Sequence, residues 1–113
     1  MHEMALAESV LRILEEQAPV KGYRRVNAVH LEVGALSCVE PEALRFQFEA
    51  VTRGSLAEAA RLEIIPVPGE GWCLPCACSV AVASFLDPCP QCGGFEVQVT
   101  GGEELQIKEL EVE

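Results

Sequence analysis

Positive charge is scarce in this chain, and one long stretch has none. The 113 residues contain 8 Lys and Arg against 18 Asp and Glu, which gives a formal net charge of −10. No Lys or Arg lies between Arg61 and Lys108. Binding to phosphates needs cations, so this composition argues against nucleic acid and anionic membranes as partners.

The sequence also lacks a long apolar run and a targeting segment. Its longest weakly polar stretch, from Cys73 to Leu86, is too short to span a bilayer and contains Pro75. The start of the chain has neither the positive charge nor the apolar run of a signal peptide. We therefore expect a soluble, cytoplasmic protein with no membrane partner.

Sequence patterns typical of enzymes are missing as well. We find no paired catalytic carboxylates with a base, no nucleophile motif and no glycine-rich loop that could cradle a phosphate. Half of the residues are apolar, which is enough for one modest core with a small metal-stapled lobe. We predict a folded protein that is not an enzyme.

What the sequence does contain is the apolar periodicity of two helices and a small sheet. Apolar side chains such as Leu6, Val10 and Ile13 recur at helical spacing, and Pro19 with Gly22 is expected to end that helix. Other segments alternate with the period of a strand. The pattern predicts helices over 4–17 and from Pro41 to about Gly54, and strands over 26–33, 61–67 and 105–112.

Two groups of breaking residues divide the chain. Pro66, Pro68, Gly69 and Gly71 interrupt the pattern from the end of the 61–67 strand onward, and Gly101-Gly102 interrupts it again. The last strand is too short to be stable alone and is expected to return to the earlier strands. We predict a helix-and-sheet domain over 1-67, a zinc-binding domain over 68-102 and a returning strand over 103-113.

The predicted fold class follows from this order of elements. It is α+β, with two helices packed on a small mixed three-stranded sheet and an inserted zinc-ribbon-like β lobe.

Two CxxC pairs are the most specific motif of the chain. Cys73 and Cys76 form the first, Cys89 and Cys92 the second, and twelve residues separate them. Each pair closes a tight turn that directs two sulfurs at one point, and four thiolates suit tetrahedral zinc. A hairpin between the pairs is expected to bring them together. Four protein ligands leave no open position, so such a site is structural.

The cysteines permit other interpretations. Iron in a rubredoxin-like site fits the same spacing, whereas a redox dithiol would need a βα unit that is not apparent. Disulfides are less favoured because no signal peptide is present. Cys78 could compete with Cys76 as a ligand, although a small apolar role is preferred for it. Cys38 is expected to be a buried hydrophobic residue.

The N-terminus offers a second set of metal ligands. The α-amine of Met1 with the amide and imidazole nitrogens of His2 can close adjacent chelate rings, and Ni(II) favours square-planar nitrogen ligands. The amide or carboxylate of Glu3, or a partner, could complete the set. A solvated terminal histidine without a function is the alternative, because chain termini are usually mobile.

The chain resembles the HypA/HybF family of hydrogenase-maturation nickel proteins. The resemblance runs in order along essentially the whole chain, and the initial Met-His-Glu and the paired CxxC motifs are its most specific parts. The matching stretches are Met1 to Leu6, Val33 to Glu40, Phe48-Glu49, Arg53 to Ser55, Trp72-Cys73 with Cys76, Cys89-Pro90 with Cys92, and Leu105 to Val112.

This resemblance implies a nickel metallochaperone. Met1, His2 and Glu3 fall on the family's nickel motif, and the four paired cysteines fall on its structural zinc motif. Nickel is then cargo for the large subunit of [NiFe]-hydrogenase, delivered together with a GTPase partner, and some members also serve urease maturation. A zinc-ribbon interaction module without nickel transfer is the alternative function.

Overall fold

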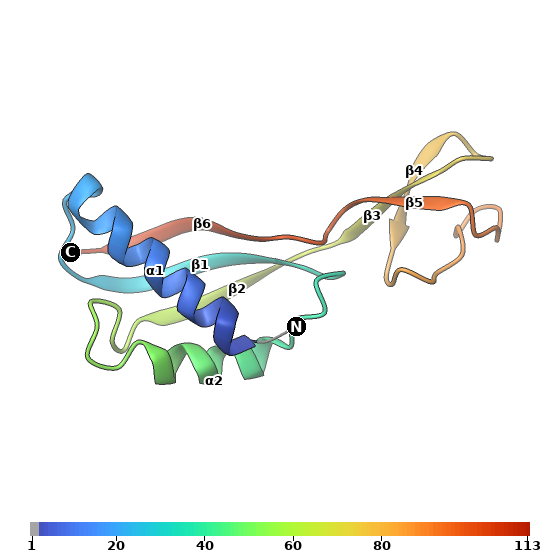
Figure 1. Cartoon of the computed structure of the whole chain (residues 1–113). Coiled ribbons are helices and arrows are strands. Elements are labelled where there is room, and N and C mark those ends of the chain that lie inside the picture. The colour runs from blue at the N-terminus through green and yellow to red at the C-terminus, as the bar shows by residue number, and fades with distance from the viewer. Residues whose placement is uncertain (1–2) are drawn as a thin grey trace. The chain divides into compact units, whose positions relative to one another are not determined.

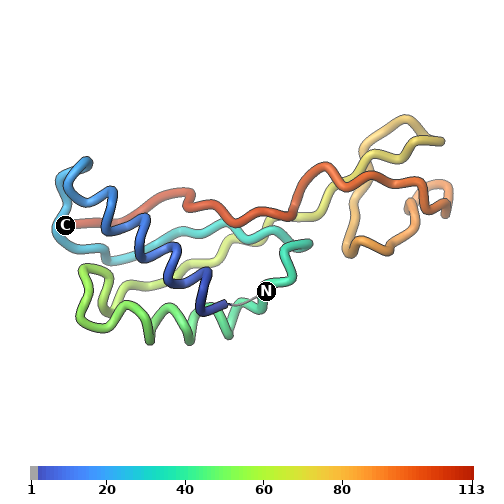
Figure 2. Tube along the Cα trace, in the orientation of Figure 1, coloured from blue at the N-terminus to red at the C-terminus, as the bar shows by residue number. Residues whose placement is uncertain are grey.

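The computed structural model of the chain describes residues 3–113, which form an α+β fold (Figures 1 and 2). The strands make two three-stranded sheets, in the orders β2-β1-β6 and β4-β3-β5. In chain order the elements are α1 (Glu3–Lys21), β1 (Val26–Gly34), α2 (Pro41–Val51), β2 (Arg61–Val67), β3 (Gly69–Cys73), β4 (Cys78–Val82), β5 (Val97–Gly101) and β6 (Leu105–Val112). The predicted fold class is confirmed, and the last strand returns to pair beside β1 as expected.

The described chain forms two compact units. The first consists of the chain up to Leu31, Val39–Ile64 and Ile107–Glu113, and the second of Glu32–Cys38 and Ile65–Gln106. Across residues 3–113, no helix has both the length and the apolar character needed to cross a membrane.

Buried side chains of both helices and of β1 form the core of the first unit. Leu14 of α1 and Leu44 of α2 are completely buried, and Phe48 is nearly so. α2 begins at Pro41 as predicted, because Pro is favourable in the first turn of a helix and the Glu40 carboxylate accepts a hydrogen bond from the Ala43 N–H at 2.7 Å.

The first helix is longer than predicted, because α1 continues past Pro19 to Lys21 and ends only before Gly22, the second of the two expected stops. Pro19 lies in the last turn, where it removes only one intrahelical hydrogen bond. The N–H of Gly22 then closes the helix on the Ala18 carbonyl at 2.8 Å. The Tyr23 hydroxyl donates to the Leu14 carbonyl and fixes the chain that leaves the helix.

The second unit is built on a hairpin of β3 and β4. Their antiparallel register places Cys73 opposite Cys78, and β5 pairs with the other side of β3. The predicted hairpin between the two CxxC pairs therefore lies around the first pair instead, because that tight turn itself reverses the chain. Gly71 does not break the strand but lies inside β3. A side chain would not fit at this position, because a Cβ there would lie 2.6 Å from Val97 Cγ1.

Candidate metal centre

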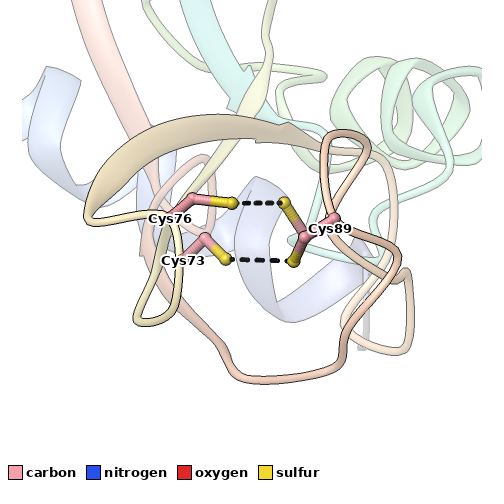
Figure 3. A group of neighbouring side chains, drawn as sticks. Cys73, Cys76 and Cys89 are labelled. Carbon is pink, nitrogen blue, oxygen red and sulfur yellow. Dashed lines mark hydrogen bonds between the residues drawn. The ribbon is translucent and has the colours of Figure 1, made fainter.

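The structure brings the four paired cysteines into one cluster. Cys73 ends β3, Cys76 lies in the turn after it, and Cys89 and Cys92 lie in the loop between β4 and β5. The Sγ atoms of Cys73 and Cys92 are 3.7 Å apart, and those of Cys76 and Cys89 are 4.0 Å apart (Figure 3). All four Sγ atoms lie within 4.8 Å of one another.

These sulfur positions fit a tetrahedral thiolate site. A metal ion bound to sulfur at about 2.3 Å separates its ligands by about 3.8 Å, which matches the two measured Sγ–Sγ distances. Cys73 and Cys89 are buried, and Cys92 is exposed. Leu36, Val80 and Val82 share a core with the two buried cysteines, so the site belongs to the core of the second unit.

Both CxxC turns have the same backbone geometry. The Ala77 N–H donates to the Cys73 carbonyl and the Gly93 N–H to the Cys89 carbonyl, each at 2.8 Å. Ala77 and Gly93 adopt left-handed backbone, with φ of 51° and 73°. The sequence marks the second turn as the easier one, since glycine adopts this conformation at little cost and alanine does not.

Proton sharing among the crowded thiols separates their acidities. Side-chain hydrogen bonds, first from Cys73 and then from Cys92, raise the pKa of Cys76 to about 12. The backbone N–H of Cys92, with that of Gln91, lowers the pKa of Cys89 to about 7. The backbone N–H of Cys76 favours the Cys73 thiolate, but burial and the neighbouring thiols raise the pKa of Cys73 overall. Metal binding here must therefore displace protons.

Asp87 holds the loop that leads to the second cysteine pair, a role that our sequence reasoning missed. Its carboxylate accepts from the Ser84 hydroxyl at 2.7 Å and from the Ala83 N–H at 3.1 Å. The Ser84 hydrogen bond is the main reason that the pKa of Asp87 is lowered. A Ser-x-x-Asp pattern immediately before Pro88-Cys89 is the signal that indicates this turn.

The two remaining cysteines lie outside the four-sulfur cluster. The Cys78 thiol lies 3.7 Å from Gln91 Oε1. Cys38 is exposed and has a left-handed backbone with φ of 61°, so the expectation that it is buried is wrong. It occupies the loop that leads into α2, where the chain turns instead of packing.

The predicted nickel ligands are only partly within the described residues. Met1 and His2 lie outside them. Glu3 begins α1, and its Oε2 lies 3.5 Å from the backbone N–H of Glu40, at the outer limit of a hydrogen bond. The third residue of the motif is thus next to the N-cap of α2.

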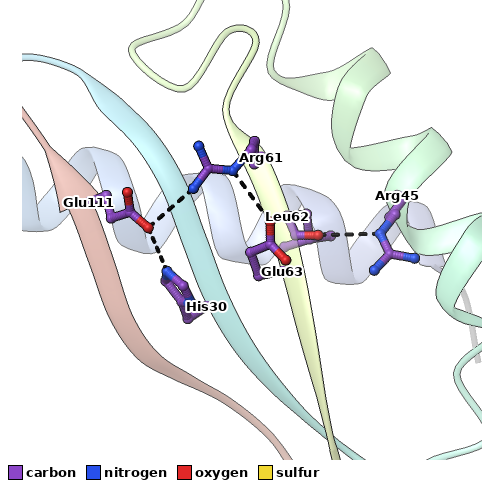
Figure 4. A network of polar contacts seen from close by, with 6 residues as sticks. All are labelled: His30, Arg45, Arg61, Leu62, Glu63 and Glu111. Carbon is purple, nitrogen blue, oxygen red and sulfur yellow. Dashed lines mark hydrogen bonds and ion pairs between the residues drawn. The ribbon is translucent and has the colours of Figure 1, made fainter.

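The second histidine of the chain has a separate environment. His30 Nε2 lies 2.8 Å from Glu111 Oε2, which also accepts from Arg61 Nη2 at 3.2 Å (Figure 4). This network lies on the face of the strands opposite α1 (Figure 4). The hydrogen bond from His30 is the main cause that lowers the pKa of Glu111, and Arg61 adds to it.

Comparison with known proteins gives matches along the whole chain. Residues 1–112 match the family described as "Hydrogenase/urease nickel incorporation, metallochaperone, hypA". Hydrogenase maturation factors HypA from Azotobacter chroococcum mcd 1 and Azotobacter vinelandii are 60% and 58% identical to it, each over 100% of both chains. The solution structure of the Ni metallochaperone HypA from Helicobacter pylori has the same fold, with a TM-score of 0.71 at 24% identity over 99% of this chain and 97% of that one.

Proposed function

Because the chain belongs to the HypA family of nickel-incorporation metallochaperones, we propose that it binds Ni(II) at Met1, His2 and Glu3 and delivers it to the large subunit of [NiFe]-hydrogenase. The observation that carries this proposal is the match of residues 1–112 to that family, which includes the Met-His-Glu start. The role as a hydrogenase maturation metallochaperone follows from the family, whereas the ligands and the recipient are the proposal.

The chemistry of the start suits a cargo that must be released. A free amine at Met1, the amide and imidazole nitrogens of His2 and the Glu3 amide provide the four nitrogen ligands that square-planar nickel favours. All of these ligands come from three consecutive residues of one peptide. A recipient can therefore replace the ligands one at a time.

The position of Glu3 suggests that one end of the proposed nickel site is anchored to the fold. Its carboxylate is next to the Glu40 N–H, and α1 starts at this residue. Since α1 is packed through Ala7, Val10 and Leu14, the chelating peptide begins directly on a rigid element. This favours the Glu3 amide over its carboxylate as the nickel ligand.

We assign Zn(II) to the four-thiolate site, with a structural role. Cys73, Cys76, Cys89 and Cys92 supply a full tetrahedral set, so neither water nor substrate has a position on the ion. The ion would neutralise thiolates that otherwise share protons in the core of the second unit.

Contact with proteins is the other part of the proposed role. The cysteine-bearing unit exposes apolar side chains, since Leu86 and Phe95 are 85% and 73% exposed. These exposed side chains are available for contact with a partner protein. The proposed partners are the GTPase of nickel insertion, the hydrogenase large subunit and, for urease maturation, the corresponding accessory proteins.

The test is nickel binding by the full-length chain, measured by calorimetry after the four-thiolate site has been loaded with zinc. His2→Ala and a variant with one extra residue before Met1 are each expected to lose most of the nickel affinity. The first loses the imidazole, and the second replaces the free amine with an amide. His30→Ala is the matched control. It removes the other histidine of the chain, whose imidazole contacts Glu111.

Two results would refute the nickel site. One is undiminished affinity in both N-terminal variants, and the other is an equal loss in His30→Ala. The content of the thiolate-bound metal is measured alongside, so that a general loss of fold is recognised.

A further inference from the structure

One groove of the first unit is lined by residues that belong to neither proposed metal site. It runs between α1 and β6 and has a volume of about 540 Å³. Its floor is preformed, because Leu14 and Tyr23 are buried and the Tyr23 hydroxyl is bonded to the Leu14 carbonyl. Apolar side chains of β6 form its other wall, namely Ile107, Leu110 and Val112.

α1 extends over the position that one more strand would take. Among residues 3–113, β6 is at the edge of its sheet, which leaves its outer backbone groups available for pairing with another strand. The C-terminal end of α1 lies beyond β6, on the side away from β1 (Figure 1). Ile13 belongs to the predicted apolar face of this helix and lines the groove, but it is 45% exposed. An added strand would cover both Ile13 and Val112.

The charge at the groove differs from that of the rest of the molecule. Lys21 and Lys108, the only two lysines of the sequence, both line it, and Glu109 is the one acidic residue among its lining. The charged side chains that line the groove, two lysines and Glu109, therefore sum to +1 in a chain of net charge −10. Among the ion pairs of residues 3–113, neither lysine takes part. A carboxylate from a partner protein would form the ion pair that these lysines do not make within residues 3–113.

We propose that the groove binds an extended, acidic segment of a partner protein as a fourth strand on β6. The segment pairs its backbone with the free edge of β6, as in other cases of strand addition. Its alternate apolar side chains enter the groove beside Ile13, and its carboxylates contact Lys21 and Lys108.

A second copy of this chain fits the groove less well. Two copies repel each other through their net charges of −10. The segment that would be added in a symmetric pair, residues 103–113, carries five glutamates and only Lys108. Strands of this kind repel each other when they are paired directly.

The test uses a synthetic peptide in which valines alternate with threonines between terminal glutamates, and a matched peptide with terminal lysines. Each is titrated into the metal-loaded full-length chain and followed by the NMR shifts of backbone amides. The glutamate peptide is expected to shift the amides of β6 and of the second half of α1, and to bind about tenfold more tightly than the lysine peptide. The double variant Lys21→Glu/Lys108→Glu should reverse this preference.

Two further variants separate the groove from a general apolar attraction. Ile13→Ser is expected to weaken peptide binding, whereas Val20→Ser, on the same helix and 76% exposed but outside the groove, should leave it unchanged. The proposal is overturned if both peptides bind equally or not at all, or if the shifts lie elsewhere. A dimer in sedimentation that Ile13→Ser dissociates would instead assign the groove to a second copy.

Discussion

The left-handed residue after each CxxC pair makes the metal centre sensitive to single methyl groups. Gly93→Ala places a Cβ at φ of 73°, where no atom lies within 4 Å, so the effect comes only from the backbone. The left-handed conformation costs an L residue about 1–2 kcal/mol, and alanine recovers about 0.5–1 kcal/mol of unfolded-state entropy relative to glycine. The net destabilisation is about 0.5–1 kcal/mol. Ala77→Gly relieves the same strain and is expected to stabilise the site by a similar amount.

Competition with a chelator measures this prediction. A change of about 0.7 kcal/mol alters metal affinity about threefold, downward for Gly93→Ala and upward for Ala77→Gly. The double swap should return close to the parent chain, because the two turns are separate. Gly94→Ala is the control, since its backbone is not left-handed and its Cβ would lie 3.5 Å from Cys92 Sγ, an ordinary contact. Equal affinities for Gly93→Ala and Gly94→Ala, or weaker binding by Ala77→Gly, would refute this reasoning.

Two other predictions concern the metal and the charged network. Cys89→Ser should release the metal and increase amide hydrogen exchange across residues 65–106 far more than in α1, because Cys89 is a core residue of the second unit; unchanged metal content would contradict the four-thiolate site. Glu111→Gln should lower the stability of the first unit at neutral pH. Because the pKa of Glu111 is lowered in the fold, its contribution is complete above the ordinary carboxyl pKa and disappears as pH falls through the lowered one. Urea unfolding of both proteins at several pH values checks this, and a difference that does not vary with pH would contradict it.

The parts of the fold that were predicted well are those in which the signal is local. Strand β2 has the expected bounds, Arg61–Val67, and α2 starts at Pro41, because turn residues and apolar alternation flank both. The four cysteines could be grouped from spacing alone, since each CxxC turn brings its own two sulfurs together. The fold class followed from the order of these elements.

The parts that could not be predicted depend on contacts between distant residues. Gly71 reads as a breaker in the sequence, but it lies inside β3 because Val97 packs where its side chain would be. Ile13 lies on the apolar face of α1, yet nothing in the periodicity says how much of that face the sheet covers. Pro19 similarly predicts the end of the helix, although α1 continues to Lys21. The sequence alone does not show that Pro19 lies in the last turn, where a proline is tolerated.

The two proposed metal sites differ in how easily they release their metal ion, and this decides between storage and transfer. Four thiolates fill all the positions of a tetrahedral ion, and two of them lie in the core of the second unit, so release requires several thiolates to take up protons. A chelate formed by one short peptide can exchange its ligands one at a time. The proposed strand-binding groove contains no metal ligand, so we expect it to serve the transfer of nickel and not the retention of either metal. A partner held on β6 would stay close to the first unit, which bears the proposed cargo site, and its carboxylates would pair with lysines that have no other ion pair among residues 3–113.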